Sequence, residues 1–238
     1  MRVAAISDIH GNLPALQAVL ADLEHEEIDG IVVAGDTISG PWPVEVFDVV
    51  ARLGADVVRG NADREVIQRS EQFGQLAPWC ADLLGDERIE AAAAWPLTLD
   101  LEVEGLGRVL VCHSTPVSDD PIYTRITPEE ELLTLLGDVD ADVVLCGHTH
   151  MQYDRRLSSG RRVVNPGSVG LPYEGSPGAY WALLGPGVAW RRTEYEVEAT
   201  VAAIRGLGAP VDQQLLAYLV DPPSPEDTTA YFESLRGT

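Results

Sequence analysis

The chain has 238 residues, 45% of them hydrophobic and 23% charged, which is typical of globular proteins and sufficient for one sizeable α/β core. Its net charge of −22 repels phosphate backbones, so general binding to nucleic acids or to anionic membranes is not expected. No apolar run approaches the ~18 residues of a membrane span, and three cysteines are too few for a disulfide framework, so we expect a cytoplasmic protein without a membrane segment.

Three strand–loop–helix units are predicted at the start of the chain. Strands and helices alternate over residues 2–7, 14–25, 30–36, 44–53 and 55–59. The first strand begins directly after Met1, so we expect no signal peptide. Asn12 is the expected cap of the first helix. Such units predict a parallel sheet whose functional groups collect at the carboxyl ends of the strands.

The middle of the chain is predicted to add helices and a second sheet. A helical pattern covers residues 64–94, with breaks near Gly74, Pro78 and Gly85. The alternating run 97–104 and the apolar run 108–113 predict a hairpin. Thr127-Pro128-Glu129-Glu130 reads as a capping box that opens a helix ending near residue 136. Between them, the irregular loop 114–126 has the length typical of functional loops.

The last third of the chain is predicted to complete the antiparallel strands and to end in helices. Strands are expected at residues 141–145, 153–157, 161–165, 179–184 and 188–194. A helical tail follows over about 196–238, and Ser224 is expected to start its last helix, which is a candidate contact in a homo-oligomer. Because no repeat, linker or low-complexity tract interrupts the chain, we predict one domain over residues 1–238.

Metal-ligand side chains stand where the predicted strands end. They are Asp8, His10, Asp36, Asn61, His113, His148 and His150, and they include four of the five histidines. On its own, a His-x-His pair on a loop is more typical of a solvated loop than of a metal site. The other strand ends favour the metal site, because strands of one parallel sheet carry such side chains to a common edge.

The set Asp8-x-His10, Gly35-Asp36, Gly60-Asn61, His113 and Gly147-His148-x-His150 resembles the calcineurin-like metallophosphoesterase superfamily. The resemblance spans residues 6–168, and the stretches 6–12 and 165–170 are similar to its small bacterial and archaeal phosphodiesterase branch. It implies an α/β fold, a four-layer α/β/β/α sandwich with two mixed β-sheets. It also implies two metal ions, one held by Asp8, His10 and His150, the other by Asn61, His113 and His148. Asp36 would bridge both ions, and Asp8, Asp36, Asn61 and His113 are the implied catalytic residues.

The donor chemistry agrees with this assignment. Only two carboxylates, Asp8 and Asp36, oppose the four positive charges of two divalent ions, so the site stays net positive and suits hydroxide and a phosphate anion. Mixed imidazole and carboxylate ligation favours Mn, Fe, Ni or Zn over Mg or Ca, and manganese is our first choice.

The expected reaction is hydrolysis of a phosphodiester, or of a phosphomonoester, in a small-molecule or nucleotide substrate by a metal-bridged hydroxide. The alternatives are a phosphomonoesterase or protein phosphatase, and a non-catalytic metal-binding scaffold of the same fold. A nucleotide-binding dehydrogenase is disfavoured, because no G-x-G-x-x-G motif follows the first strand.

One residue departs from the family pattern. Ala62 stands where many members have a histidine that protonates the leaving group or holds the phosphate. Such an acid contributes on the order of 10²- to 10⁴-fold in rate. We therefore expect better activity on esters with good leaving groups, such as aryl esters, than on alkyl esters.

Further residues are candidates for supporting roles. Arg64 is a candidate contact to the substrate phosphate, with a surface arginine at a helix start as the alternative. Tyr173, with Trp42 and Tyr123, lies in loops expected to rim the crevice, where an aromatic ring stacks on substrate or holds its own loop. Asn165 is expected to orient a loop or a ligand imidazole, or to form a turn before the next proline. Asp63 is expected to cap a helix rather than to bind metal.

Overall fold

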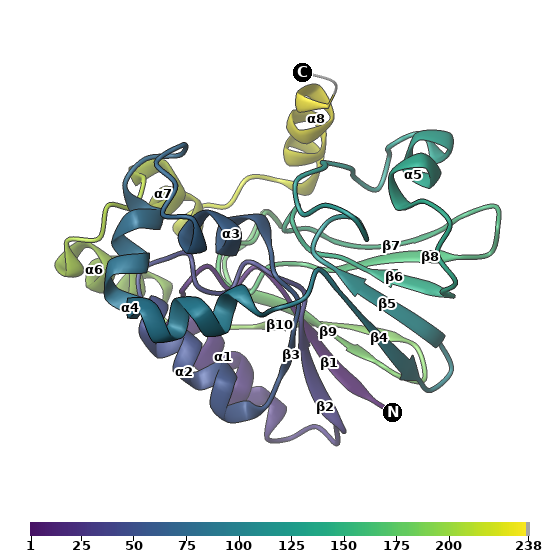
Figure 1. Ribbon diagram of the computed structural model, residues 1–238, viewed down its shortest axis with the longest axis horizontal. Coiled ribbons are helices and arrows are strands. Elements are labelled where there is room, and N and C mark those ends of the chain that lie inside the picture. Colours follow the sequence, from purple (N-terminus) through teal and green to yellow (C-terminus); the bar gives the residue numbers. More distant parts are fainter. Residues whose placement is uncertain (237–238) are drawn as a thin grey trace.

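Two five-stranded β-sheets and flanking helices form the computed structural model, which describes residues 1–236 (Figure 1). Side chains from both sheets, among them Ala5, Val32, Val111 and Leu145, pack in one buried cluster between them. The helices α1 (Leu13–Leu23) and α2 (Pro43–Leu53) lie on the outer face of the first sheet, and α5 (Glu129–Leu136) lies on the outer face of the second. The predicted four-layer α/β/β/α sandwich is confirmed.

The first sheet has the order β10-β9-β1-β2-β3. Its strands are β1 (Val3–Ile6), β2 (Gly30–Val33), β3 (Asp56–Val57), β9 (Ala179–Leu184) and β10 (Val188–Thr193). β1, β2 and β3 run parallel, while β9 pairs antiparallel with β1 and with β10. The parallel arrangement predicted for the first three strands is therefore correct, and it brings their carboxyl ends to one edge.

The second sheet has the order β4-β5-β6-β8-β7 and is also mixed. Its strands are β4 (Thr98–Val103), β5 (Gly107–Cys112), β6 (Val143–Leu145), β7 (Gln152–Arg156) and β8 (Arg162–Pro166). The predicted hairpin is the antiparallel pair β4–β5, and β6 runs parallel to both β5 and β8. The carboxyl ends of β5 and β6 therefore lie side by side.

The other helices are α3 (Asn61–Ile67), α4 (Leu76–Ala93), α6 (Val197–Leu207), α7 (Gln213–Val220) and α8 (Pro225–Leu235). Asn12 and Ser224 cap α1 and α8, because each side chain accepts a hydrogen bond from a backbone N–H in the first turn. Positions 237 and 238 of the predicted tail lie outside the described residues. Within the described chain, no helix is both long and apolar enough to cross a membrane.

Two local predictions were wrong. Pro78 does not break the helical stretch, because it lies in the first turn of α4, where proline is tolerated. The Thr127 hydroxyl does not cap α5. It donates a hydrogen bond to Glu233 of α8, and the N-cap position belongs to Pro128, which has no side-chain cap. A tertiary contact therefore replaces the predicted local one.

Candidate metal centre

Seven ligand-type side chains follow the carboxyl ends of five strands. Asp8 and His10 come after β1, Asp36 after β2, Asn61 after β3, His113 after β5, and His148 and His150 after β6. Backbone hydrogen bonds join these loops, with Asp8 N donating to Gly35 O at 3.0 Å and Gly147 N donating to His113 O at 2.8 Å. The two sheets thus place the seven residues around one point.

Five of these residues have a left-handed backbone. The φ angles are 52° at Asp8, 46° at His10, 53° at Asp36, 70° at His148 and 57° at His150. L-residues other than glycine rarely adopt this region, although Asp and His tolerate it better than most. Such strain concentrates at functional sites, where the surrounding structure holds it in place.

Four of the side chains form a tight cluster. Asp8, His10, Asp36 and His150 offer ligand atoms that all lie within 4.8 Å of one another. His10 Nε2 is 3.1 Å from His150 Nε2, and His150 Nε2 is 3.3 Å from Asp8 Oδ1. These contacts place two imidazole nitrogens and a carboxylate oxygen around a common space.

The other three side chains adjoin this cluster through Asp36. Asp36 Oδ2 is 3.6 Å from His10 Nε2 and 3.4 Å from His113 Nε2, so this carboxylate lies between the two groups. His113 Nε2 is also 2.9 Å from Asn61 Oδ1. The His148 ring lies 5.0 Å from the His113 ring between centroids, and its Nε2 is 3.2 Å from the Asp120 carbonyl oxygen.

Neighbouring carbonyl groups orient two of the imidazoles. His113 Nδ1 lies 2.8 Å from Ala34 O, and His150 Nδ1 lies 2.6 Å from Leu171 O. A carbonyl only accepts hydrogen bonds, so each Nδ1 carries the proton and each Nε2 is directed at the cluster. This arrangement is common around metal-binding histidines, where the carbonyl fixes the ring and its tautomer.

Burial and mutual charge shift the pKa values of the site strongly. Burial disfavours the His113 imidazolium, yet the Asp36 carboxylate outweighs it and raises the pKa of His113 to about 10. The pKa of His148 falls to about 4, because burial and the nearby His113 both oppose its charge. The pKa values of Asp8 and Asp36 are lowered despite burial, since His150 and His113, respectively, stabilise their ionised forms. The carboxylates are therefore ionised at neutral pH.

The residues present fit a bound cation. Asp8 is fully buried, and its Oδ2 has no hydrogen-bond partner among residues 1–236. A buried carboxylate oxygen without a partner is costly, so it indicates a ligand that would satisfy it. The close approach of His10 Nε2 to His150 Nε2 has the same explanation, because two such nitrogens can share a cation.

Two buried polar side chains hold the loops of the site. The amide of Asn165 donates to Gly147 O at 2.5 Å and to Thr149 Oγ1 at 3.2 Å, and so fixes the loop that carries His148. The carboxylate of Asp63 accepts from the backbone N–H groups of Gly60, Thr37 and Ile38, at 3.0, 2.8 and 2.9 Å. Asp63 therefore caps α3 and also fastens the loop after β2.

The residues predicted to contact or surround the substrate interact with other groups of the protein in the structure. Arg64 is held by Asp119 and Asp120 of the loop after β5, with Nε 3.1 Å from Asp119 Oδ1 and Nη2 2.6 Å from Asp120 Oδ1. Tyr173 stacks on His150, with ring centroids 4.9 Å apart and planes at 13°. Tyr123 is 3% exposed and donates to Ser114 O at 2.6 Å, so it does not rim a crevice and that prediction was wrong.

Sequence reasoning missed the groups that the irregular loops supply. Asp119 and the carbonyl oxygens of Asp120 and Leu171 all contact site residues, but none belongs to a periodic element. Only the length of the loop 114–126 marked this segment as a candidate functional part of the chain.

Comparisons with known proteins agree with this geometry. A family model described as the calcineurin-like phosphoesterase superfamily domain matches residues 1–184. Phosphodiesterase YfcE of Escherichia coli (strain K12) is 27% identical over 194 residues, which cover 77% of this chain and 87% of YfcE. A solved metallophosphoesterase from Sphaerobacter thermophilus aligns with a TM-score of 0.74 and 28% identity, over 92% of this chain and 98% of its own. The hypothetical protein PH1004 from Pyrococcus horikoshii OT3 shares the fold, with a TM-score of 0.80 and 22% identity over 94% of this chain and 99% of its own.

Proposed function

Because the chain belongs to the calcineurin-like phosphoesterase superfamily, we propose that it hydrolyses phosphodiester bonds in small-molecule or nucleotide substrates with two divalent transition-metal ions. One observation supports this most directly. The buried Oδ2 of Asp8 has no hydrogen-bond partner within the described chain, at the centre of a cluster of imidazoles and carboxylates. A cation is the ligand that such a cluster accommodates best.

The proposal assigns the seven side chains to two ions. One ion would be held by Asp8, His10 and His150. The other would be held by Asn61, His113 and His148, and Asp36 would bind both ions. Bound ions of this kind supply Lewis acidity toward phosphoryl oxygens and lower the pKa of bound water toward neutrality. Manganese remains the first choice, because imidazole and carboxylate donors suit the transition metals.

Groups of the protein itself orient the ligand side chains and set the charge of the centre. Ala34 O and Leu171 O hold the imidazoles of His113 and His150 with Nε2 toward the cluster. Asp36 receives a hydrogen bond from Ala62 N at 2.8 Å on Oδ1, which leaves Oδ2 facing His10 and His113. With two carboxylates against four positive charges, the centre attracts a phosphate anion although the whole chain carries a charge of −22.

A phosphodiester is the first choice of substrate, and a phosphomonoester is the second. The first choice is supported by the curated relative whose name is phosphodiesterase, at 27% identity. The absence of a histidine at position 62 also favours esters whose leaving groups depart without a protein acid. The proposal places the enzyme in the cytoplasm, in agreement with free, buried thiols at Cys80, Cys112 and Cys146.

The test is hydrolysis of bis(4-nitrophenyl) phosphate and of 4-nitrophenyl phosphate. We expect turnover to vanish after treatment with a chelator and to return when manganese is added. Asp36→Asn removes the shared carboxylate and should lower kcat by on the order of 10²-fold or more. Asp56→Asn, the same change at an exposed position of β3, is the control and should leave the rate unchanged. No turnover on either ester would favour the non-catalytic scaffold, and turnover that survives the chelator would contradict the role proposed for the ions.

A further inference from the structure

A cavity of about 220 Å³ lies beside the candidate metal centre, with His10 and Asn61 in its wall. Four parts of the chain enclose it: the loops after β1 and β2, the segment from α3 through the start of α4, the loop after β8, and the helices α6 and α7 with the turn between them. The family model matches residues 1–184, so both of these helices lie beyond the matched region. The tail therefore supplies a wall next to the site of chemistry.

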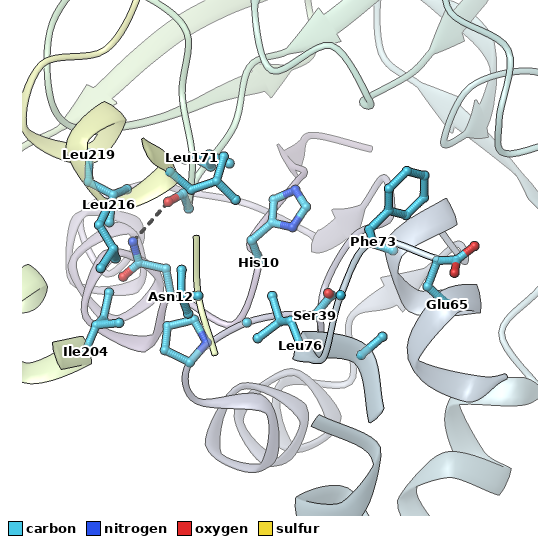
Figure 2. Close-up of a pocket in the computed structure, with 18 of the residues that line it drawn as sticks. His10, Asn12, Ser39, Glu65, Phe73, Leu76, Leu171, Ile204, Leu216 and Leu219 are labelled. Atoms are coloured by element: carbon cyan, nitrogen blue, oxygen red, sulfur yellow. Dashed lines mark hydrogen bonds between the residues drawn. The ribbon is translucent and has the colours of Figure 1, made fainter. Parts of the chain in front are cut away.

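The walls of this cavity are mainly apolar. Figure 2 shows Ile204, Leu216 and Leu219 on one side of His10 and Phe73 on the other. The three tail residues are buried, whereas Phe73 is 78% exposed at the opposite wall. An apolar wall with few polar groups binds an organic group by removing its surface from water.

The polar groups of the cavity restrict the charge of what it binds. The Nδ2 of Asn12 already donates to Gly170 O at 3.0 Å and to Tyr195 Oη at 3.2 Å. Glu65 is buried; its Oε1 pairs with Arg64 Nη1 at 3.1 Å, while its Oε2 has no hydrogen-bond partner within residues 1–236. A negatively charged ligand group would lose its water against a mainly apolar lining, and Glu65 Oε2 offers it no hydrogen-bond donor, so its burial is disfavoured.

The volume indicates the size of the occupant. A buried apolar cavity of about 150 Å³ is known to hold benzene. The cavity here is larger, at about 220 Å³, so it accommodates one ring or two fused rings. Ala62 belongs to the same wall, and its small side chain leaves the space beside Asn61 open.

We propose that this cavity binds an uncharged aromatic group of the phosphoester substrate, and that α6 and α7 set this specificity. The inference rests on the proposed function, because the ring is placed beside a centre that acts on the phosphate. It assigns a role to the C-terminal tail, which contributes no side chain to the cluster of ligand-type residues.

The first experiment measures binding without turnover. 2-Naphthol is the uncharged probe and 2-naphthoate is the charged one, and both are added to chelator-treated protein and followed by saturation-transfer NMR. We expect 2-naphthol to bind and 2-naphthoate not to bind. Leu215→Asp puts a charge on the α7 wall, and Ala77→Trp fills the cavity from α4; each should weaken 2-naphthol binding at least 10-fold. Both residues are half-buried, which limits the risk of unfolding.

Leu207→Asp is the matched control. Leu207 is 44% exposed on α6 and lies outside the cavity wall, so this variant should bind 2-naphthol as the wild type does. Circular dichroism should show that all variants are folded. Unchanged 2-naphthol binding in both cavity variants would overturn the inference.

The second experiment compares two diesters with the same leaving group. Bis(4-nitrophenyl) phosphate has a second aryl arm, and methyl 4-nitrophenyl phosphate has a methyl group in its place. The ratio of their kcat/KM values should fall roughly 10-fold or more in both cavity variants, mainly through KM, and should stay constant in Leu207→Asp.

The two experiments separate the two ideas. Metal-dependent turnover with a ratio that neither cavity variant changes would overturn the inference and leave the proposed function standing. Loss of 2-naphthol binding in both variants, without turnover of either ester by the wild type, would overturn the proposed function and support the cavity as a binding site.

Discussion

At the scale of single residues, position 62 links the candidate metal centre to the cavity beside it. Ala62 N donates to Asp36 Oδ1 at 2.8 Å, while its methyl group forms part of the cavity wall. The backbone at this position thus serves the centre whatever side chain it carries. The side chain alone decides whether a proton donor or open space lies next to Asn61.

This leads to a prediction for Ala62→His. An imidazole here could protonate a leaving group, so diphenyl phosphate, with its more basic leaving group, should gain on the order of 10²-fold in kcat over the wild type. Bis(4-nitrophenyl) phosphate should gain little, because its leaving group departs without help. Steady-state rates on both esters measure the difference.

Ala62→Phe is the control for the added bulk, since its ring has no proton to give. No gain with Ala62→His on diphenyl phosphate would contradict the prediction. A wild-type pH–rate profile that requires a titrating protein acid would do so as well.

How far single residues could be predicted depends on how local their surroundings are. The ligand-type side chains follow strand ends, and the parallel pairing of β1 with β2 brings Asp8 and Asp36 together by a general rule. Arg64 pairs with Asp119, which lies 55 positions away in an irregular loop, and no periodic sequence pattern predicts such a contact. Tyr173 likewise stacks on His150, which the sequence pattern does not show.

At the scale of elements, the carboxylate of Glu233 helps to attach the last helix to the rest of the molecule. Glu233 of α8 accepts hydrogen bonds from the hydroxyl groups of Thr124 and Thr127, both at 2.5 Å, and also pairs with Arg236. Burial would raise the pKa of Glu233, but these three donors outweigh it and lower the pKa below its ordinary value of 4.5.

The stability from Glu233 should therefore depend on pH. A carboxylate whose pKa is lower in the folded state stabilises above its unfolded pKa, and this contribution is lost as the pH falls through the folded value. Glu233→Gln should lower the free energy of unfolding by about 0.5–1 kcal/mol at neutral pH. The difference should shrink as the pH falls below 4.5, the ordinary pKa of the group.

Urea unfolding of both proteins over a pH series measures this effect. Glu90→Gln, the same change at an exposed position of α4, is the control and should not alter stability. An equal difference between wild type and Glu233→Gln at all pH values would show that the charge of Glu233 is not responsible.

Elements were predictable where their sequence pattern is periodic. The apolar run of β9 matches its predicted bounds, 179–184, because a fully buried strand leaves an unbroken hydrophobic signal. The capping box at Thr127 failed for a tertiary reason, since Glu233 lies 106 positions away and takes the hydroxyl. Gly85 does interrupt α4, with φ of 70° and ψ of 169°, as the predicted break there implied.

At the scale of the whole molecule, sheet order lies beyond local patterns. The pairing of β9 with β1, with Val3 opposite Leu184, joins segments from opposite ends of the matched domain. Strand signals predict that two sheets exist, but only the family resemblance implied that they stack as a sandwich. The balance of acidic and basic residues, by contrast, is a property of the whole molecule that follows directly from its composition.

That balance predicts how the molecule responds to salt. With 38 acidic and 16 basic residues, the folded chain at pH 7 concentrates a net charge of −22, and this self-repulsion destabilises the compact state. Salt shortens the Debye length from about 30 Å at 0.01 M to about 10 Å at 0.1 M and about 3 Å at 1 M. Raising NaCl from about 0.02 M to about 0.5 M at pH 7 should therefore raise Tm by about 2–4 °C, the shift that about 1 kcal/mol gives a chain of this size.

Differential scanning calorimetry at two pH values distinguishes repulsion from a general salt effect. As the pH falls toward the isoelectric point of about 4.3, carboxylates become protonated and the net charge shrinks, so the same salt step should then change Tm less. Salt also weakens the surface ion pairs, such as Arg108 with Asp140, which opposes the gain. A fall in Tm with salt at pH 7 would mean that these local attractions outweigh the repulsion among the excess acidic groups.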